Sequence, residues 1–221
     1  MSTLLFDMIR RGQTAEFAAE VEAHPELAHA HDAQGVSALL WSIYTGQSLT
    51  RDFLRARISE PDIFEAAALG DIARLAALLA ADPGSVHAVS GDGWTPLHLA
   101  AAFAGPDAVR LLLEQGASVR AISANVQQNH PLHAALALNS SVETVRLLLD
   151  AGADPNATQA GGFAPLHSAA SAGKREAAQL LLERGANPAQ LDNHGNPPAH
   201  YARQRGHAEL AGFLDSQPRS N

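Results

Sequence analysis

The sequence predicts an all-α solenoid in which about seven helix-turn-helix units stack in a row. Three observations predict it. First, histidines recur at intervals of 35, 34 and 33 residues, at His98, His133, His167 and His200. Second, the first three are each followed, 13 or 14 residues later, by a leucine triplet and then by a glycine–alanine pair. Third, hydrophobic residues make up 46% of the chain but aromatic residues only 5%, a composition that favours slender helices packed closely.

Each unit is predicted to contain two short helices. In GDGWTPLHLAA, residues 91–101, Thr95 is a favourable N-cap and Pro96 suits the first helical position. Leucine and alanine then follow at helical spacing and face the neighbouring units. Gly105 ends this helix, the leucine triplet lies in a second one, and Gly116 closes the second. One such pair cannot bury its apolar stripe alone, so adjacent pairs must share a continuous core.

Two units lack the capping threonine. His130 and Ala164 occupy the position before Pro131 and Pro165. Alanine has no side-chain acceptor for the N–H groups of the first helical turn, and histidine replaces threonine only in part. We therefore expect the substitution Ala164→Thr to stabilise the fold.

The repeated stretch and its period of about 33 residues resemble the ankyrin-repeat family. The resemblance is strong over residues 90–215, where HPLHAAL (130–136), APLHSAA (164–170) and PPAHYAR (197–203) repeat the T-P-L-H-x-A pattern. It is weaker over residues 1–89. In DAQGVSALLWSIYTG (32–46), Ser37, Ala38 and Leu40 replace the threonine, proline and histidine, and in the next unit Phe64 takes the histidine position.

The resemblance implies one domain over residues 1–217, followed by a tail, 218–221. Its units are expected at about 1–31, 32–60, 61–89, 90–124, 125–158, 159–191 and 192–217. The outer units are atypical and act as caps, as the ends of a repeat array must. The connection Arg55–Pro61 lacks the usual glycine and hairpin, and we expect the array to be most irregular there and to act as a hinge.

The recurrent histidines are predicted to be structural. Equivalent positions on stacked helices lie 8–10 Å apart, whereas zinc ligands must lie about 2.0–2.1 Å from one ion. The family resemblance implies that these rings bond to backbone or hydroxyl groups of adjacent turns. No cofactor or metal is therefore expected. The alternative is a metal-binding or enzymatic protein that uses the loop bearing His24, His29 and His31.

Composition and charge narrow the possible partners and locations. Residues 1–110 carry 7 basic and 14 acidic residues, and the whole chain has a net charge of −8. An acidic surface repels phosphate, which argues against nucleic acid. No stretch approaches the ~20 apolar residues of a membrane span, and the N-terminus has no signal-peptide pattern. These features favour a cytoplasmic monomer, and the alanine-rich, lysine-poor composition suggests a bacterial source.

Enzyme signatures are missing from the sequence. It contains no cysteine, which excludes a thiol nucleophile, and no P-loop, G-x-S-x-G or H-E-x-x-H motif. We therefore expect a non-catalytic module that binds a partner protein or peptide through its concave face. A third possibility is a bacterial effector that binds a host protein.

The family resemblance also implies which positions face a partner. They are the residue before the Thr-Pro position and the two residues before the glycine that follows the first helix. From these positions we select Trp94, Phe163, Phe103, Leu138, Asn129, Tyr44, Asn196 and Arg205. Exposed aromatic residues at the centre of an array are typical of interface hot spots. For Phe103 and Leu138 the competing interpretation is burial between units.

Overall fold

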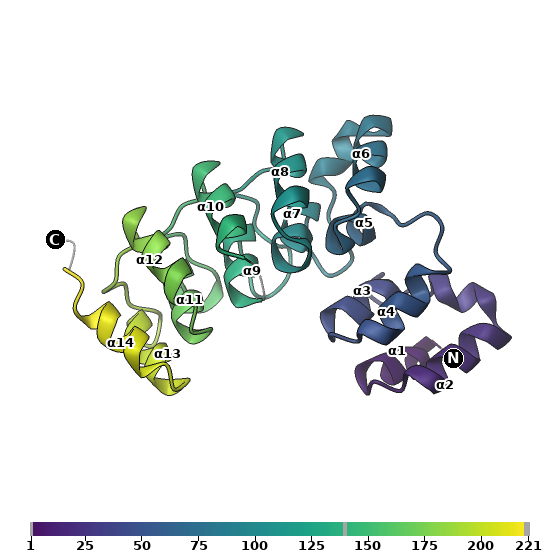
Figure 1. The fold of residues 1–221 in the computed structure, drawn as a ribbon, viewed down its shortest axis with the longest axis horizontal. Coiled ribbons are helices and arrows are strands. Elements are labelled where there is room, and N and C mark those ends of the chain that lie inside the picture. Colours follow the sequence, from purple (N-terminus) through teal and green to yellow (C-terminus); the bar gives the residue numbers. More distant parts are fainter. Residues whose placement is uncertain (1, 139–140, 219–221) are drawn as a thin grey trace.

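The computed structural model describes residues 2–138 and 141–218. Within these ranges it contains fourteen α-helices and no β-strand, apart from an isolated antiparallel bridge between His31 and Ser37. The helices follow one another in pairs along an elongated, curved array (Figure 1). The predicted all-α solenoid is therefore confirmed.

The seven pairs have the following bounds. The first three are α1 (Ser2–Arg10) with α2 (Thr14–Ala23), α3 (Ala38–Tyr44) with α4 (Ser48–Arg55), and α5 (Ile63–Leu69) with α6 (Ile72–Ala81). The fourth is α7 (Pro96–Leu99), continued by the π-helix η3 (Ala100–Ala104), with α8 (Pro106–Glu114). The last three are α9 (Pro131–Ala137) with α10 (Val142–Asp150), α11 (Pro165–Ser171) with α12 (Arg175–Glu183), and α13 (Pro198–Gln204) with α14 (Ala208–Asp215).

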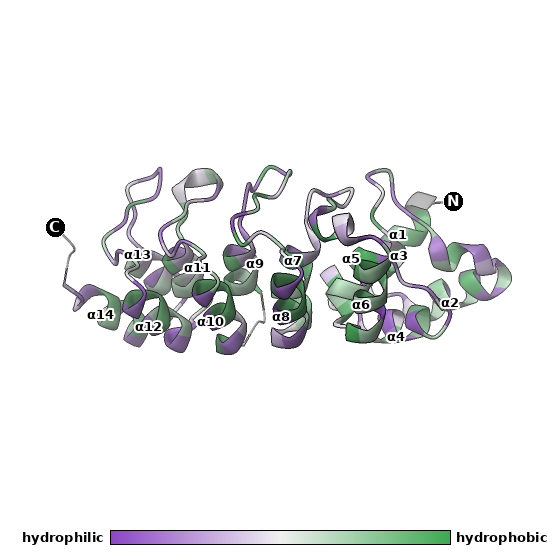
Figure 2. Ribbon diagram, turned by 90° about the horizontal axis from the view of Figure 1, so that it is seen from above, coloured by the Kyte–Doolittle hydropathy of each residue, from purple (hydrophilic) through white to green (hydrophobic). Residues whose placement is uncertain are grey.

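Helices and loops occupy different sides of the array. From α5 onward the odd-numbered helices follow the inner side of the curve and the even-numbered helices its outer side (Figure 1). The loops between pairs project together to one side (Figure 2). The inner helices and these loops therefore border one extended surface, as in other solenoids.

Histidines join successive units through a repeated hydrogen-bond pattern. The Nδ1 atom of His98 accepts a bond from the Thr95 backbone N–H, and its Nε2 atom lies 3.0 Å from the carbonyl oxygen of Asn129 in the next loop. Equivalent Nε2 bonds reach the carbonyls of Phe163 and Asn196, from His133 and His167 respectively. The predicted structural role is confirmed for these three rings. The fourth, His200, is exposed and packs edge-on against Tyr201.

The two expected weak caps are visible in the structure. Neither His130 nor Ala164 makes a side-chain capping bond to its helix. The His130 ring instead stacks on His133, with ring centroids 5.7 Å apart. The backbone N–H of Ala164 still donates to Nδ1 of His167. This unit therefore keeps the histidine bond to the N-cap backbone but lacks the bond that a threonine hydroxyl would accept.

The third pair begins differently from its neighbours. Phe64 lies six residues before Gly70, which is the spacing of His167 from Gly173. The spacing between Thr95 and His98 would make Pro61 the N-cap of this unit. Instead Asp62 is the N-cap of α5, and it forms a reciprocal capping box with Glu65. The histidine position and the capping position therefore separate in this unit.

The predicted irregularity lies between the second and third pairs. The hydrophobic core divides into two clusters within the second pair, where Leu39 of α3 belongs to the N-terminal cluster and Leu40 to the larger one. The connection that follows α4 is nevertheless anchored, because Ile58 is 3% exposed in the N-terminal cluster and Arg55 pairs with Asp71 at the start of α6. Whether it acts as a hinge stays a prediction.

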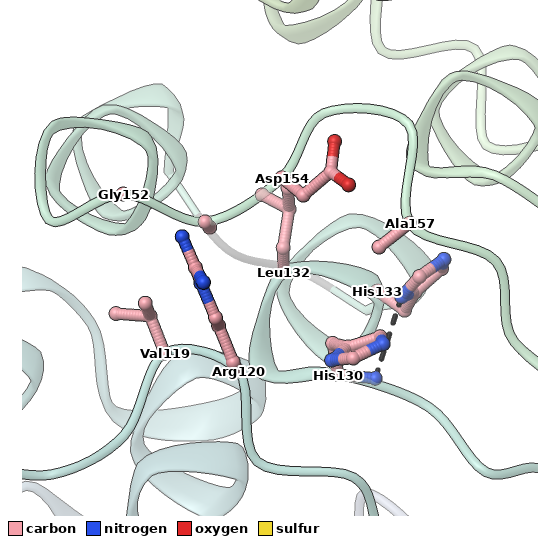
Figure 3. Close-up of a pocket in the computed structure, with 9 residues that line it drawn as sticks. Val119, Arg120, His130, Leu132, His133, Gly152, Asp154 and Ala157 are labelled. Atoms are coloured by element: carbon pink, nitrogen blue, oxygen red, sulfur yellow. Dashed lines mark hydrogen bonds between the residues drawn. The ribbon is translucent and has the colours of Figure 1, made fainter.

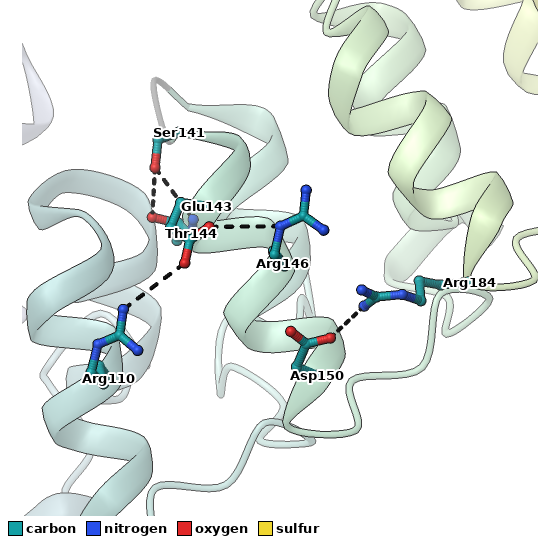
Figure 4. A network of polar contacts seen from close by, with 7 residues as sticks. All are labelled: Arg110, Ser141, Glu143, Thr144, Arg146, Asp150 and Arg184. Carbon is teal, nitrogen blue, oxygen red and sulfur yellow. Dashed lines mark hydrogen bonds and ion pairs between the residues drawn. The ribbon is translucent and has the colours of Figure 1, made fainter.

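Ion pairs link the outer helices. Glu143 on α10 pairs with Arg146 on the same helix and with Arg110 on α8, while Asp150 on α10 pairs with Arg184 just after α12 (Figure 4). These side chains are between a third and a half exposed, and such pairs contribute about 0–1 kcal/mol each. The apolar core, rather than these pairs, supplies most of the stability of the stack.

Candidate interaction surface

Three aromatic side chains meet on the inner side of the array. Tyr44 and Phe103 are stacked with ring centroids 5.4 Å apart, and Trp94 lies 6.2 Å from Phe103 and 6.3 Å from Tyr44. All three are half-buried. We call Tyr44, Trp94 and Phe103 the aromatic cluster. Such packed pairs add about 0.5–1.5 kcal/mol beyond the effect of burial.

The cluster joins units that are not neighbours in the sequence. Tyr44 ends α3, whereas Phe103 lies in η3, with the helix α5 between them. The residues of α5 at this level are small, and Ala66, Ala67 and Ala68 are all buried. Because these three side chains are small, they leave room for the rings on either side of α5 to touch.

The missing hairpin before α5 brings the flanking loops together. A Cβ atom placed on Gly91 would lie 1.7 Å from the carbonyl oxygen of Gln34, in the loop before α3. The loops before α3 and α7 are therefore in direct contact, although a whole helix pair separates them in sequence. This contact carries Trp94 to the side of Tyr44.

An extra residue shapes the other half of the cluster. His98 lies seven residues before Gly105, whereas the corresponding spacing is six in the next but one unit, from His167 to Gly173. The chain absorbs the insertion as the π-helix η3, in which the Gly105 N–H bonds to the Ala100 carbonyl. Such π-bulges are rare and frequent at functional sites. Phe103 is one of the η3 residues.

A second group of rings lies near the C-terminal end. Phe163 is half-buried, and its ring centroid lies 4.7 Å from that of Tyr201 and 5.2 Å from that of His167. Tyr201 was not among the residues selected from the sequence, and its hydroxyl donates to Asp192. Trp41, also unselected, donates from Nε1 to Asp32 in the same way. The shared spacing of nine residues from aspartate to aromatic residue is a signal that could have identified both.

The other selected residues differ widely in exposure. Leu138 is 38% exposed, so burial between units does not apply to it. Arg205 is exposed on the surface after α13. Asn129 is only 8% exposed and its Oδ1 atom has no partner among the described residues. Asn129 and Asn196 contribute mainly their backbone carbonyls, which receive the histidine bonds.

Carboxylates surround the aromatic cluster. Burial raises the pKa of Tyr44 well above its usual range, and the negative charges of Asp92, Asp62 and Asp32 raise this pKa further. The Tyr44 hydroxyl forms no hydrogen bond among the described residues. Within the described ranges, none of the three aspartates belongs to an ion pair. Arg10 compensates part of the charge of Asp32, so Asp92 and Asp62 are the main sources of negative charge beside the cluster.

Two hollows of the surface bear on the search for a ligand site. A cavity of about 320 Å³ lies beneath the loops around α9, with Arg120, His130, Leu132 and Asp154 among its lining residues (Figure 3). A second, of about 240 Å³, is lined by Ile43, Ala68, Leu69 and Phe103 together with Ser42, Gly46, Ser48 and Arg51. We call the second cavity the notch. Phe103 makes it continuous with the aromatic cluster.

The histidines of the alternative metal site, His24, His29 and His31, do not form a metal-binding group among the described residues. In the part of the chain that the structure describes, no three His, Cys, Asp or Glu side chains are grouped so that they could hold a metal ion. The His24 ring lies 3.7 Å from Glu26, whereas His31 takes part in the bridge to Ser37. Among the described helices, none is both long and apolar enough to cross a membrane.

Comparison with known proteins finds relatives that are similar to part of this chain. A probable E3 ubiquitin-protein ligase, XBOS31, from Oryza sativa subsp. japonica is 40% identical over 110 residues, which are 49% of this chain and 23% of that protein. The B-cell lymphoma 3 protein homolog of Mus musculus is 39% identical over 82 residues, 37% of this chain and 18% of that protein. The E3 ubiquitin-protein ligase XB3, also from Oryza sativa subsp. japonica, is 40% identical over 96 residues, 43% and 21% respectively.

These matches span less than a quarter of each relative, so the similarity covers one region of those proteins. The family model for ankyrin repeats in three copies matches residues 63–159 and 143–217, which together are well over half of the chain. The matched region contains the histidine-linked helix pairs and the leucine triplets described above. The chain therefore belongs to the ankyrin-repeat family.

Proposed function

We propose that this protein is a non-catalytic module that binds a partner protein or peptide through the inner surface of its curved array. Ankyrin repeats are generally protein–protein interaction modules. The observation that carries the proposal is the aromatic cluster. Its half-buried rings lie on the extended inner surface, and aromatic residues are enriched among those that dominate the binding energy of protein interfaces.

The binding surface in this proposal extends over several units. The aromatic cluster forms its N-terminal part, and Leu138, Phe163 and Arg205 its C-terminal part. An apolar centre with a polar rim is typical of interaction sites. Asn129 and Asn196 contribute through the loops that their carbonyls hold in place. The module acts as a cytoplasmic monomer within a single domain over residues 1–217.

Photo-crosslinking tests this function directly. A photoreactive amino acid replaces Leu138, on the proposed surface, or Arg146, on the outer helix α10, and each protein is returned to the source cells. The proposal requires partner adducts at position 138 and none at position 146. Adducts only at position 146 would show that the outer helices bind the partner.

A double variant gives the energetic test. Trp94→Ala/Phe163→Ala is compared with the outer-face variant Arg110→Ala/Arg146→Ala for retention of the crosslinked partner. We expect the first to lose the partner and the second to keep it. Thermal unfolding of both proteins separates lost contacts from lost folding, since both aromatic residues also pack within the chain. Retention of the partner by a folded double variant would contradict the assignment.

A further inference from the structure

We propose that the aromatic cluster and the neighbouring Asp92 carboxylate bind a partner segment that presents an arginine or lysine side chain next to an apolar one. This inference deepens the proposed function and rests on it. It names the partner by its chemistry, a basic side chain over the rings with an apolar side chain in the notch.

The ring faces of the cluster suit a cation. Cations are attracted to aromatic faces within about 6 Å of the ring centroid. The described residues make three such contacts, with Arg10 over Trp41 at 4.5 Å, Arg57 over Phe53 at 3.6 Å and Arg175 over Phe213 at 4.5 Å. The Trp41 ring packs edge-on against Tyr44, so the first contact lies beside the cluster. Among the described residues, no arginine or lysine occupies the equivalent position over the aromatic cluster. A partner cation can therefore take it.

The charge around the cluster favours the same occupant. Asp92 lies two residues before Trp94, and the Ser90 hydroxyl that donates to the Asp92 carboxylate also accepts a bond from the Trp94 backbone N–H. Asp32 is already engaged by Trp41 Nε1, and Asp62 caps α5. Asp92 accepts a bond from the Ser90 hydroxyl and is half-buried, like the rings of the cluster. It is the carboxylate best able to pair with an incoming cation.

Part of the notch is apolar and suits the adjacent apolar side chain, beside the polar residues Ser42, Ser48 and Arg51 that also line it. Its apolar wall consists of Ile43, Ala68, Leu69 and Phe103, and Phe103 is also a member of the cluster. A segment whose cation lies over Trp94 can therefore place a neighbouring side chain beside Leu69. Nucleic acids and acidic peptides fit poorly, because residues 1–110 carry seven more acidic than basic residues.

Selection from defined peptide pools tests this chemistry. The full chain is panned against three pools of random twelve-residue peptides whose central residue is fixed as arginine, leucine or glutamate. We expect the arginine pool to be enriched at least tenfold over the glutamate pool, with apolar residues selected one to three positions from the arginine. Equal enrichment of the glutamate pool, or no enrichment of the arginine pool, would overturn the proposal.

Matched variants then place the peptide on the surface. The most enriched arginine peptide is titrated against wild type, Asp92→Asn, Trp94→Leu and the control Asp154→Asn, which neutralises an exposed carboxylate in another loop. Affinity should fall at least fivefold for Asp92→Asn and Trp94→Leu and stay within twofold for the control. The Asp92→Asn effect should shrink in 0.5 M NaCl because salt screens the charge. Unchanged binding to both folded variants would overturn the assignment.

The two proposals fail in different ways. Peptides from the leucine pool could crosslink at position 138 and bind the Asp92→Asn variant with unchanged affinity. That result would overturn the inference of a basic segment but would agree with binding at the inner surface. Peptides that crosslink only at position 146 would overturn the inner-surface function itself.

Discussion

The Nε2 atom of His98 lies 3.0 Å from the carbonyl oxygen of Asn129, a residue of the next unit. The same ring accepts a bond at Nδ1 from its own helix start. One neutral imidazole thus serves as donor and acceptor at once, which fixes its tautomer with the proton on Nε2. Protonation of Nδ1 would remove the acceptor, so the link between units depends on a neutral ring.

Acid should therefore destabilise the array. Burial lowers the pKa of His98 and of His133 from 6.5 to about 4, against the opposing effect of the carbonyl bond, and the nearby charge of His130 lowers both further. Because the pKa of each ring is lower in the folded than in the unfolded chain, its contribution to the unfolding free energy is completely present above pH 6.5. It falls as the pH drops from 6.5 to about 4.

The acid effect can be measured by urea unfolding at pH 7.5, 6, 5 and 4. At 1.36 kcal/mol per pKa unit, each ring accounts for at most about 3 kcal/mol of the loss. His200 is exposed, and His200→Gln is the control for the substitution of a histidine as such. A stability that is flat from pH 7.5 to 4 would contradict the prediction.

Ala164→Thr should raise the unfolding free energy. Ala164 is the N-cap of α11 but has no side-chain acceptor, whereas Thr95 occupies the same position before α7 and caps it. The expected gain is about 0.5–2 kcal/mol, the usual value of such a cap. The reverse change, Thr95→Ala, should lose a similar amount. A lower melting temperature for Ala164→Thr would show that a hydroxyl at this position does not cap α11.

Gly91→Ala should loosen the contact between the loops before α3 and α7. Its new methyl group would lie 1.7 Å from the Gln34 carbonyl oxygen, so the loops must separate. We expect a loss of about 1–3 kcal/mol, as for other overpacked sites, and a shift of Trp94 fluorescence. Gly84→Ala is the matched control, since its methyl group would meet only the Asp82 side chain at 3.2 Å. Equal stability of the two variants would rule out the close contact.

Lys174→Met should destabilise the boundary between the fifth and sixth pairs. The Nζ atom of Lys174 donates to the Ala135 carbonyl at 3.0 Å and to the Leu138 carbonyl, at the C-terminal end of α9. Methionine keeps the apolar stem but leaves these carbonyls without the charged donor, for an expected loss of about 1–2 kcal/mol. Lys174→Arg should restore part of it. Calorimetric unfolding of the three proteins decides the order.

The connection Arg55–Pro61 should exchange its amide hydrogens faster than the rest of the array. The connection passes from the N-terminal core cluster, which includes Ile58, to the larger cluster, and the N–H groups of Ser59 and Glu60 form no backbone hydrogen bond with the described residues. Hydrogen exchange followed by mass spectrometry compares it with the Leu147–Leu149 segment of α10, which is packed between α8 and α12. Similar protection in the two segments would exclude a hinge.

Most of the helix pairs could be predicted because their signals are local. Thr95, Pro96 and Gly116 mark helix ends through the chemistry of single residues, and the histidine period aligns the units. The start of α5 was less predictable, since Asp62 and Glu65 form a capping box one residue after the position that the repeat spacing indicates. Local capping chemistry prevailed over the register of the repeat.

The candidate surface was predictable only in part. Trp94, Phe103 and Tyr44 were selected one by one as surface positions, but no local pattern indicated that they form one cluster. Asn129 was selected by the same rule, and it proves to be buried behind the bond that its carbonyl accepts. Side-chain exposure at these positions depends on the neighbouring units rather than on the repeat.

The sequence by itself determined the class of fold, the order of the helix pairs and the structural role of the histidines, because each follows from residues within one repeat length. The tertiary structure decided which residues meet on the inner surface. Tyr44 reaches Phe103 only because α5 carries alanines between them and no hairpin precedes it. A contact between two units that flank a third depends on the size and position of the side chains of the third unit. These side chains come together only when the chain is folded.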